Sequence, residues 1–77
     1  MLQAYILIQT QTGQAAAVAD AIASIAGVTS VSTLNGPYDV IAVTRTGDVD
    51  ELGQLVLEQV QSVEGITRTL TCPVARM

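Results

Sequence analysis

Two segments of the chain alternate side chains in a way that predicts central β-strands. In residues 2–10 the two sides of the expected strand carry Leu2, Ala4, Ile6 and Ile8 on one side, and Tyr5 and Leu7 on the other. Residues 40–44 are again apolar on both sides. A strand with two apolar faces is expected in the middle of a sheet, covered above and below.

Two further segments predict outer strands and a loop between the halves of the chain. Residues 28–34 are rich in Thr, Ser and Val, which is the composition of an edge strand. Residues 66–72 form a fourth expected strand, and Pro73 ends its regular pairing. Residues 35–39 lie between the second and third strands and form a loop.

Between the strands, the hydrophobic spacing changes to that of helices. Residues 13–26 predict a first helix with Thr12 as N-cap and Gly27 at its end. Its expected buried stripe consists of Val18, Ile22 and Ile25. Asp48 and Glu51 resemble a capping box that begins a second helix.

The second helix has one glycine and one leucine outside the usual pattern. Its expected buried stripe consists of Val49, Leu52, Val56, Val60 and Val63. Gly53 lies inside the helix, which predicts close approach of another backbone. Leu57 lies off the stripe, and we expect it at an interface. Gly65 ends the helix.

An internal repeat organises these elements. Residues 6–13 resemble residues 40–47, and residues 24–29 resemble residues 62–67. The offset grows by four residues between the two matches, which is about one helical turn. Two β-α-β units in tandem predict an α+β fold of the ferredoxin-like βαββαβ type, a four-stranded antiparallel sheet with two helices on one face. The first and third strands are then central.

The composition predicts that the uncovered sheet face packs on a second copy. The 77 residues form one expected domain, 1–77, of which 49% are hydrophobic and 13% charged, with a mean hydropathy of +0.47. A domain of this size buries only roughly 60% of its unfolded surface. Tyr5, Leu7 and Ile41 have no helix to cover them, so we expect at least a homodimer formed through the open sheet face.

Charge and side-chain chemistry exclude several functions. The net charge is −4, with three arginines and no lysine, so no basic patch is expected to bind nucleic acid. The absence of histidine and the single Cys72 predict no imidazole catalysis, no metal site, no cofactor and no disulfide. Asp48, Asp50 and Glu51 suit the start of a helix better than a metal site.

The sequence also predicts where the protein acts. No segment approaches the roughly 20 apolar residues of a membrane span, and no secretory signal is recognisable. We therefore expect a cytoplasmic protein with no membrane partner, and Cys72 as a small buried side chain.

The loop at residues 35–39 is the main candidate site. Asn35-Gly36 predicts a tight hairpin with positive φ, and Pro37 would stiffen it. A rigid turn alone explains these three residues without any ligand. It explains Tyr38 and Asp39 less well, because an acid entering a central strand must find a donor. Backbone N–H groups could hold a carboxylate and Asp39 an ammonium, which suits an amino acid zwitterion.

Two motifs together resemble a known family. Gly36-x-Tyr38-Asp39, followed after a helix by residues 63–69 (Val-Glu-Gly-Ile-Thr-Arg-Thr), resembles the effector-binding (RAM) domain of the Lrp/AsnC, or feast/famine, transcriptional regulators. The corresponding family patterns are G-x-Y-D and P-G-V-x-x-T-x-T, and Glu64 here takes the place of the usual proline. Thr67-Arg68-Thr69 on its own is typical of an exposed strand face.

The resemblance implies a ligand, an assembly and a set of site residues. Members of this family pair through their sheets, and the dimers form rings, often of eight or ten subunits. Amino acid effectors bind in clefts between dimers. Matched by motif, the implied ligand-binding residues are Gly36, Tyr38, Asp39, Thr67 and Thr69. Residues 74–77 would reach a neighbouring subunit.

The resemblance also implies how the domain affects transcription. Members carry an N-terminal helix-turn-helix, which this sequence does not show before its first strand. We therefore expect a stand-alone effector-binding and oligomerisation domain that modulates transcription indirectly, without binding nucleic acid itself. Two alternatives come from other classes. One is a structural or heteromeric partner of a full-length family regulator. The other is an enzyme of the dimeric α+β barrel type, which the lack of His, Trp and Phe disfavours.

Overall fold

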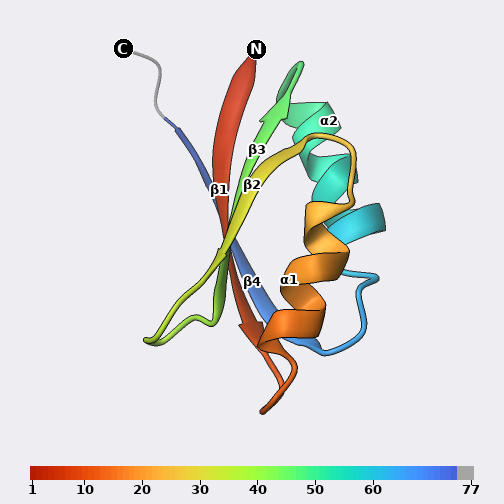
Figure 1. Ribbon diagram of the computed structural model, residues 1–77. Coiled ribbons are helices and arrows are strands. Elements are labelled where there is room, and N and C mark those ends of the chain that lie inside the picture. The colour runs from red at the N-terminus through yellow and green to blue at the C-terminus, as the bar shows by residue number, and fades with distance from the viewer. Residues whose placement is uncertain (75–77) are drawn as a thin grey trace.

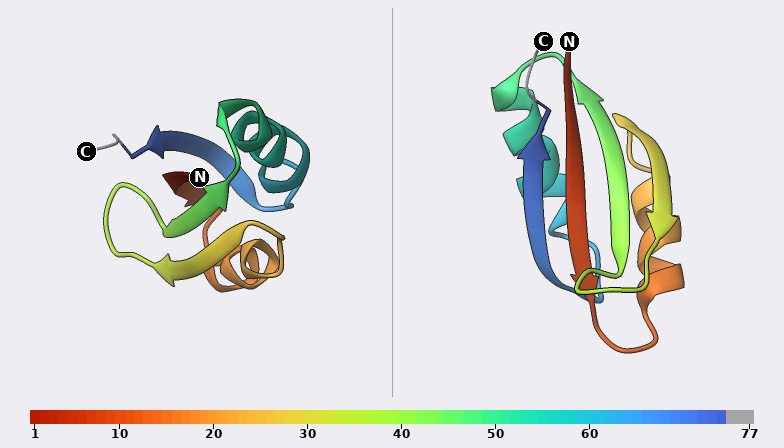
Figure 2. Two further views of the ribbon diagram at one scale, coloured as in Figure 1. Left: turned by 90° about the horizontal axis from the view of Figure 1, so that it is seen from above. Right: turned by 90° about the vertical axis from the view of Figure 1, so that its left-hand side faces the viewer.

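The strands and helices lie in two layers (Figure 1). The computed structural model describes residues 1–74. The strands β1 (Leu2–Thr10), β2 (Val28–Thr33), β3 (Val40–Thr46) and β4 (Ile66–Pro73) form a four-stranded antiparallel sheet in the order β2-β3-β1-β4. The helices α1 (Ala15–Ala23), α2 (Val49–Gln54) and η1 (Leu55–Val60) cover one face of it (Figure 2). The predicted ferredoxin-like fold is confirmed.

The register confirms that the two most apolar strands are central. β1 pairs with β3 on one side and with β4 on the other, so that Tyr5 lies opposite both Val43 and Cys72. The edge strands are β2, as expected, and β4. The β1–β4 register shifts between Gln9 and Thr10, and Thr67 is the extra residue of the resulting bulge.

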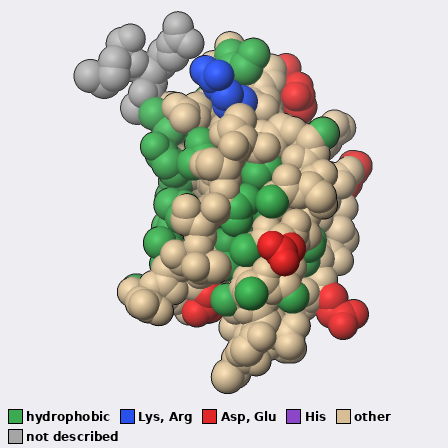
Figure 3. Space-filling model, in the orientation of Figure 1, with side chains coloured by type: hydrophobic (Ala, Val, Ile, Leu, Met, Phe, Trp, Pro, Cys, Tyr) green, Lys and Arg blue, Asp and Glu red, His purple; other side chains and the backbone are tan. Residues whose placement is uncertain are grey.

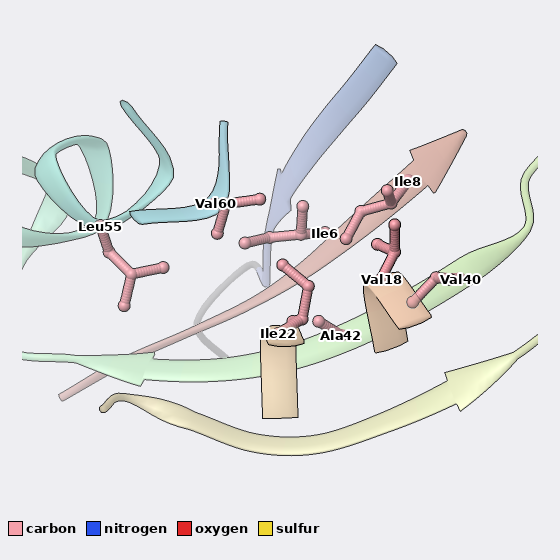
Figure 4. Close-up of a cluster of buried hydrophobic side chains, with 8 residues drawn as sticks. All are labelled: Ile6, Ile8, Val18, Ile22, Val40, Ala42, Leu55 and Val60. Carbon is pink, nitrogen blue, oxygen red and sulfur yellow. The ribbon is translucent and has the colours of Figure 1, made fainter. Parts of the chain in front are cut away.

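The core fills the space between the sheet and the helices. Its buried members are Ile6, Ile8, Val18, Ile22, Val40, Ala42, Leu55 and Val60 (Figure 4). All come from β1, β3, α1 and η1, so the two central strands supply the floor of the core and the helices its cover. This arrangement follows from the alternation of side chains along each strand.

The helix α1 is shorter than predicted and begins differently. It starts at Ala15, with Gln14 in the N-cap position and no side-chain hydrogen bond to the first turn, so the prediction of Thr12 as N-cap was wrong. Gly13 has a positive φ of 81°, which turns the chain before the helix. The helix ends at Ala23 with Ser24 as C-cap, so the prediction that it continues to residue 26 and ends at Gly27 was wrong. Gly27, with a φ of 97°, turns the chain into β2 instead.

The second helix begins as predicted. The Asp48 carboxylate accepts a hydrogen bond from Glu51 N at 2.8 Å, and the Glu51 carboxylate accepts one from Gly47 N at 3.1 Å. The reciprocal bonds of a capping box are therefore present, shifted by one residue because Glu51 reaches Gly47 rather than Asp48 itself.

The second half of this helix departs from the expected stripe because η1 is a π-helix. Gln61 N donates to Val56 O, five residues back, at 2.9 Å. In this wider turn, residues five apart share a face, so Leu55 and Val60 are buried and Val56 is half-buried. Val49, predicted to be buried, is 67% exposed.

Among the described residues, Gly53 does not meet another backbone. A Cβ atom placed there would have nothing within 4 Å, so the predicted close approach is wrong for the single chain. Leu57, expected at an interface, is exposed.

Within residues 1–74, the second face of the sheet has no helix over it. Its hydrophobic side chains follow from the register and are Tyr5, Leu7, Ile41, Val43, Leu70 and Cys72, which we call the open face. Tyr5 is 41% and Leu70 46% exposed, and Cys72 is half-buried. In Figure 3 this side of the sheet, away from the helices, is on the left, and hydrophobic side chains gather along it.

Two remaining expectations concern membranes and the tail. Within residues 1–74, no helix combines the length and the hydrophobicity needed to cross a membrane. Val74 continues the pairing beyond β4, since its N–H donates to Gln3 O at 2.8 Å. The rest of the tail that was expected to reach a neighbouring subunit, residues 75–77, lies outside the described part of the chain.

Candidate ligand-binding site

The loop between β2 and β3 is wider than the hairpin predicted from Asn35-Gly36. The last paired residues are Thr33 and Val40, so residues 34–39 form the connection. Gly36 does not have a positive φ, which makes the prediction of a tight Asn-Gly turn wrong. The reason is the following Pro37, since a residue before proline is pushed toward extended conformations.

The chain's own side chains hold this loop over the open side of the sheet. Gln9 alternates with buried Ile8 and therefore points to the open side of β1. Its Nε2 donates to Pro37 O at 2.8 Å, and Leu34 N donates to Asp39 O at 2.8 Å. Figure 2 shows the loop crossing the end of β1. The loop is thereby fixed to the rim of the sheet.

Asp39 finds the donor that a carboxylate at this position requires. Its backbone N–H donates to Ile8 O at 2.8 Å. Its Oδ2 accepts hydrogen bonds from Thr10 N at 2.8 Å and from Thr10 Oγ1 at 3.3 Å. The side chain thus takes the place of a backbone carbonyl and extends the pairing of β1 with β3 by one step. Both side-chain bonds use Oδ2, which leaves Oδ1 for another donor.

The loop brings three of the five predicted site residues to one place. Gly36 is exposed, whereas Tyr38 and Asp39 are half-buried where the loop joins β3. An aromatic ring and a carboxylate therefore stand side by side in the chain at the rim of the sheet. This combination provides one apolar surface and one acceptor for a cationic group.

The other two predicted residues lie apart from the loop. Thr69 pairs with buried Ile8, so its side chain faces the helix layer, where Gln61 Nε2 lies 3.5 Å from Thr69 Oγ1. An open pocket of about 210 Å³ lies here, at the outer edge of β4, and is lined by Gln61, Ile66, Thr67, Arg68 and Thr69. The strand β1 separates this pocket from Asp39, at roughly 10 Å between the flanking backbones.

Sequence reasoning missed three residues at this end of the sheet. Gln9 and Thr10 hold the loop, and Arg68 lies directly opposite Gln9 on β4. The sequence did indicate that the Asp39 carboxylate needs a hydrogen-bond donor. Which residue donates depends on the strand register, which the sequence does not show. Arg68 was assigned to an exposed strand face, and it is exposed.

Known proteins share both the sequence pattern and the fold. Residues 3–77 match the family described as "Lrp/AsnC ligand binding domain". An uncharacterized HTH-type transcriptional regulator of Pyrococcus furiosus is 33% identical over 54 residues, a match that covers 70% of this chain and only 36% of that regulator.

Two solved structures extend the comparison over the whole fold. A Thermus thermophilus protein superposes with a TM-score of 0.94 at 36% identity, covering 100% of this chain and 96% of that one. The complex of a Neisseria meningitidis transcriptional regulator with L-Met has the same fold, with a TM-score of 0.85 at 22% identity, covering 97% of this chain and 50% of that one.

Proposed function

The chain belongs to the family of Lrp/AsnC ligand-binding domains, and we propose that it binds an amino acid effector and assembles into oligomers that modulate transcription indirectly. The observation that carries this proposal is the loop fixed over the end of β1, which presents Tyr38 and Asp39 at the rim of an uncovered sheet face. Such a domain would act in the cytoplasm and would not itself contact DNA.

The chemistry of the loop supports an amino acid. The free Oδ1 of Asp39 is a charge-assisted acceptor for an α-ammonium group, and the backbone N–H groups of the loop are donors for a carboxylate. Tyr38 provides a surface for the apolar part of the ligand. The Neisseria regulator with the same fold is a complex with L-Met, and we extend an amino acid ligand to this chain on the basis of that likeness.

Assembly would complete the site. Thr67 and Thr69 lie on the far side of β1 from Asp39, so one chain does not enclose a ligand between all five residues. We propose that dimers formed through the open face associate further into a ring, in which a neighbouring copy encloses the ligand. A full-length family regulator could take the place of one copy in such an assembly.

A thermal-shift screen against the twenty common L-amino acids tests the ligand. At a hundredfold excess over Kd, binding stabilises the folded state by about 2.7 kcal/mol. For a domain of this size that corresponds to a rise in Tm on the order of 10–20 °C. Asp39→Asn is the informative variant, because it keeps an acceptor for Thr10 while removing the negative charge. We expect it to fold and to lose the shift.

One observation favours the alternative of a structural role. The Asp39 carboxylate is already engaged by Thr10, so the motif has a use in holding the sheet together without any ligand. If none of the twenty amino acids raises the Tm, the domain is better described as an assembly module or as a heteromeric partner of a family regulator.

A further inference from the structure

We infer that Arg68, rather than the backbone N–H groups of the loop, binds the α-carboxylate of the effector, so that the row Asp39–Gln9–Arg68, which runs from the loop across β1 to β4, selects a free amino acid. The inference rests on the proposed function and adds a residue that the predicted site did not contain. It also assigns the ligand class more narrowly, because both charges of the zwitterion are then required.

The register places these three residues in one row. Arg68 on β4 lies directly opposite Gln9 on β1, and directly opposite residues of antiparallel strands point to the same side of the sheet. Asp39 flanks β1 from the other side through its hydrogen bonds to Ile8 and Thr10. Two strand spacings separate the backbones of Asp39 and Arg68, roughly 10 Å, a span that a small zwitterion can bridge together with the two side chains that would bind it.

Gln9 holds the loop above this row. Its Nε2 donates to Pro37 O at 2.8 Å, so the loop closes one end of the row while the amide oxygen of Gln9 stays available as an acceptor. The ligand would then meet a carboxylate at one end, a guanidinium at the other and a polar amide between them. This is the charge order of an α-amino acid.

The chemistry of Arg68 suits the carboxylate. The planar guanidinium forms two parallel hydrogen bonds to a carboxylate, which a lysine or a neutral side chain does not reproduce. Arg68 is exposed, so its side chain is accessible to a ligand.

The chain contains a matched control for Arg68. Arg45 on β3 is also exposed and also lies directly opposite a glutamine of β1, Gln3, but at the other end of the strand and away from the loop. Arg45→Gln and Arg68→Gln therefore change the net charge equally, from the same kind of position on the same side of the sheet. Only Arg68→Gln should weaken the binding of the ligand.

The test compares three variants with two probes, an amino acid and its carboxamide. The twenty L-amino acids are screened first on the wild type, and the best stabiliser is then measured beside its carboxamide, which lacks the carboxylate charge. We expect Arg68→Gln to weaken binding of the amino acid by roughly 10- to 100-fold and to bind the carboxamide and the acid about equally. Arg45→Gln should keep the wild-type affinity and the wild-type preference for the acid. Arg68→Lys should restore part of that preference.

The outcomes separate this inference from the proposed function. If an amino acid stabilises the wild type and Arg68→Gln keeps the preference for the acid over the carboxamide, the role of Arg68 is wrong and the proposed function stands. An equal loss of affinity for acid and carboxamide also contradicts it, because that pattern indicates a merely structural residue. If no amino acid binds the wild type, both the proposed function and this inference fail.

Discussion

At the scale of single residues, Asp39 shows how one side chain can serve the fold and a candidate site together. The sequence predicted that this acid must find a donor, and Thr10 supplies two. The identity of the donor could not be predicted, because it depends on which residue of β1 ends beside the loop. The alternation of residues 2–10 fixes the faces of the strand but not this register.

Replacing Asp39 separates its charge from its hydrogen bonds. Asp39→Ala removes both bonds from Thr10 and leaves a half-buried N–H without its partner, which should cost about 1–3 kcal/mol in the free energy of unfolding. Asp39→Asn retains an acceptor and should cost less. Urea unfolding of the two variants measures the difference, and equal stabilities would contradict the structural role of the carboxylate.

Glycine substitutions test the corrected conformation of the loop. Gly36 lacks a positive φ and has open space where a Cβ would lie, so Gly36→Ala should change the free energy of unfolding by less than about 0.5 kcal/mol. Gly27 has a φ of 97°, and its Cβ would lie 2.8 Å from Leu55 Cδ1. Gly27→Ala should therefore cost more than about 1 kcal/mol. The ranking is read from chemical denaturation, and a Gly36→Ala variant as unstable as Gly27→Ala would restore the tight-turn interpretation.

At the scale of elements, the strands were predictable and the second helix only in part. Alternation of apolar and polar residues located all four strands within a residue or two, and the capping pair Asp48 and Glu51 located the start of α2. Hydrophobic spacing with a period of 3.6 then placed Val56 in the stripe instead of Leu55. A π-helix inserts its wider turn without a signature in the hydrophobic pattern, so this shift could not be predicted.

Two leucines in η1 test that shift. Leu55 is 8% and Leu57 is 69% exposed, although only one residue separates them. Leu55→Ala should cost about 2–5 kcal/mol, because it removes a side chain from the core. Leu57→Ala should be close to neutral in the free energy of unfolding of the single domain. Comparable losses in the two variants would contradict the burial of Leu55 and the exposure of Leu57 described above.

At the scale of the whole molecule, the internal repeat predicted the topology, and the topology left one sheet face without cover. Sequence reasoning could identify that face, because Tyr5 and Leu7 had no helix to pack against. It could not show that the predicted site residues lie in two separate places. Thr69 faces the helices, whereas Asp39 forms hydrogen bonds at the end of β1. Only the order β2-β3-β1-β4 shows that a strand stands between them.

The oligomeric state tests the open face. Leu70 is 46% exposed at its centre, opposite Leu7, and Leu70→Glu would place a charge in an apolar interface. We expect light scattering to report a dimer or a larger assembly for the wild type and a smaller species for Leu70→Glu. Leu57→Glu, the same change on the helix layer, is the control. If only Leu57→Glu reduces the mass, the helices rather than the sheet form the contact.

The sheet order also has a consequence during protein synthesis. The strand β1 is made first, yet one of its two neighbours, β4, is made last, as the pairing of Tyr5 with Cys72 shows. Until the ribosome has released β4, one edge of the most apolar strand has no partner. Unpaired edges of this kind attract strands from other chains. A transcript or a chain interrupted before residue 66 should therefore yield a product that aggregates, and a chaperone would be needed most in the interval before the last strand emerges.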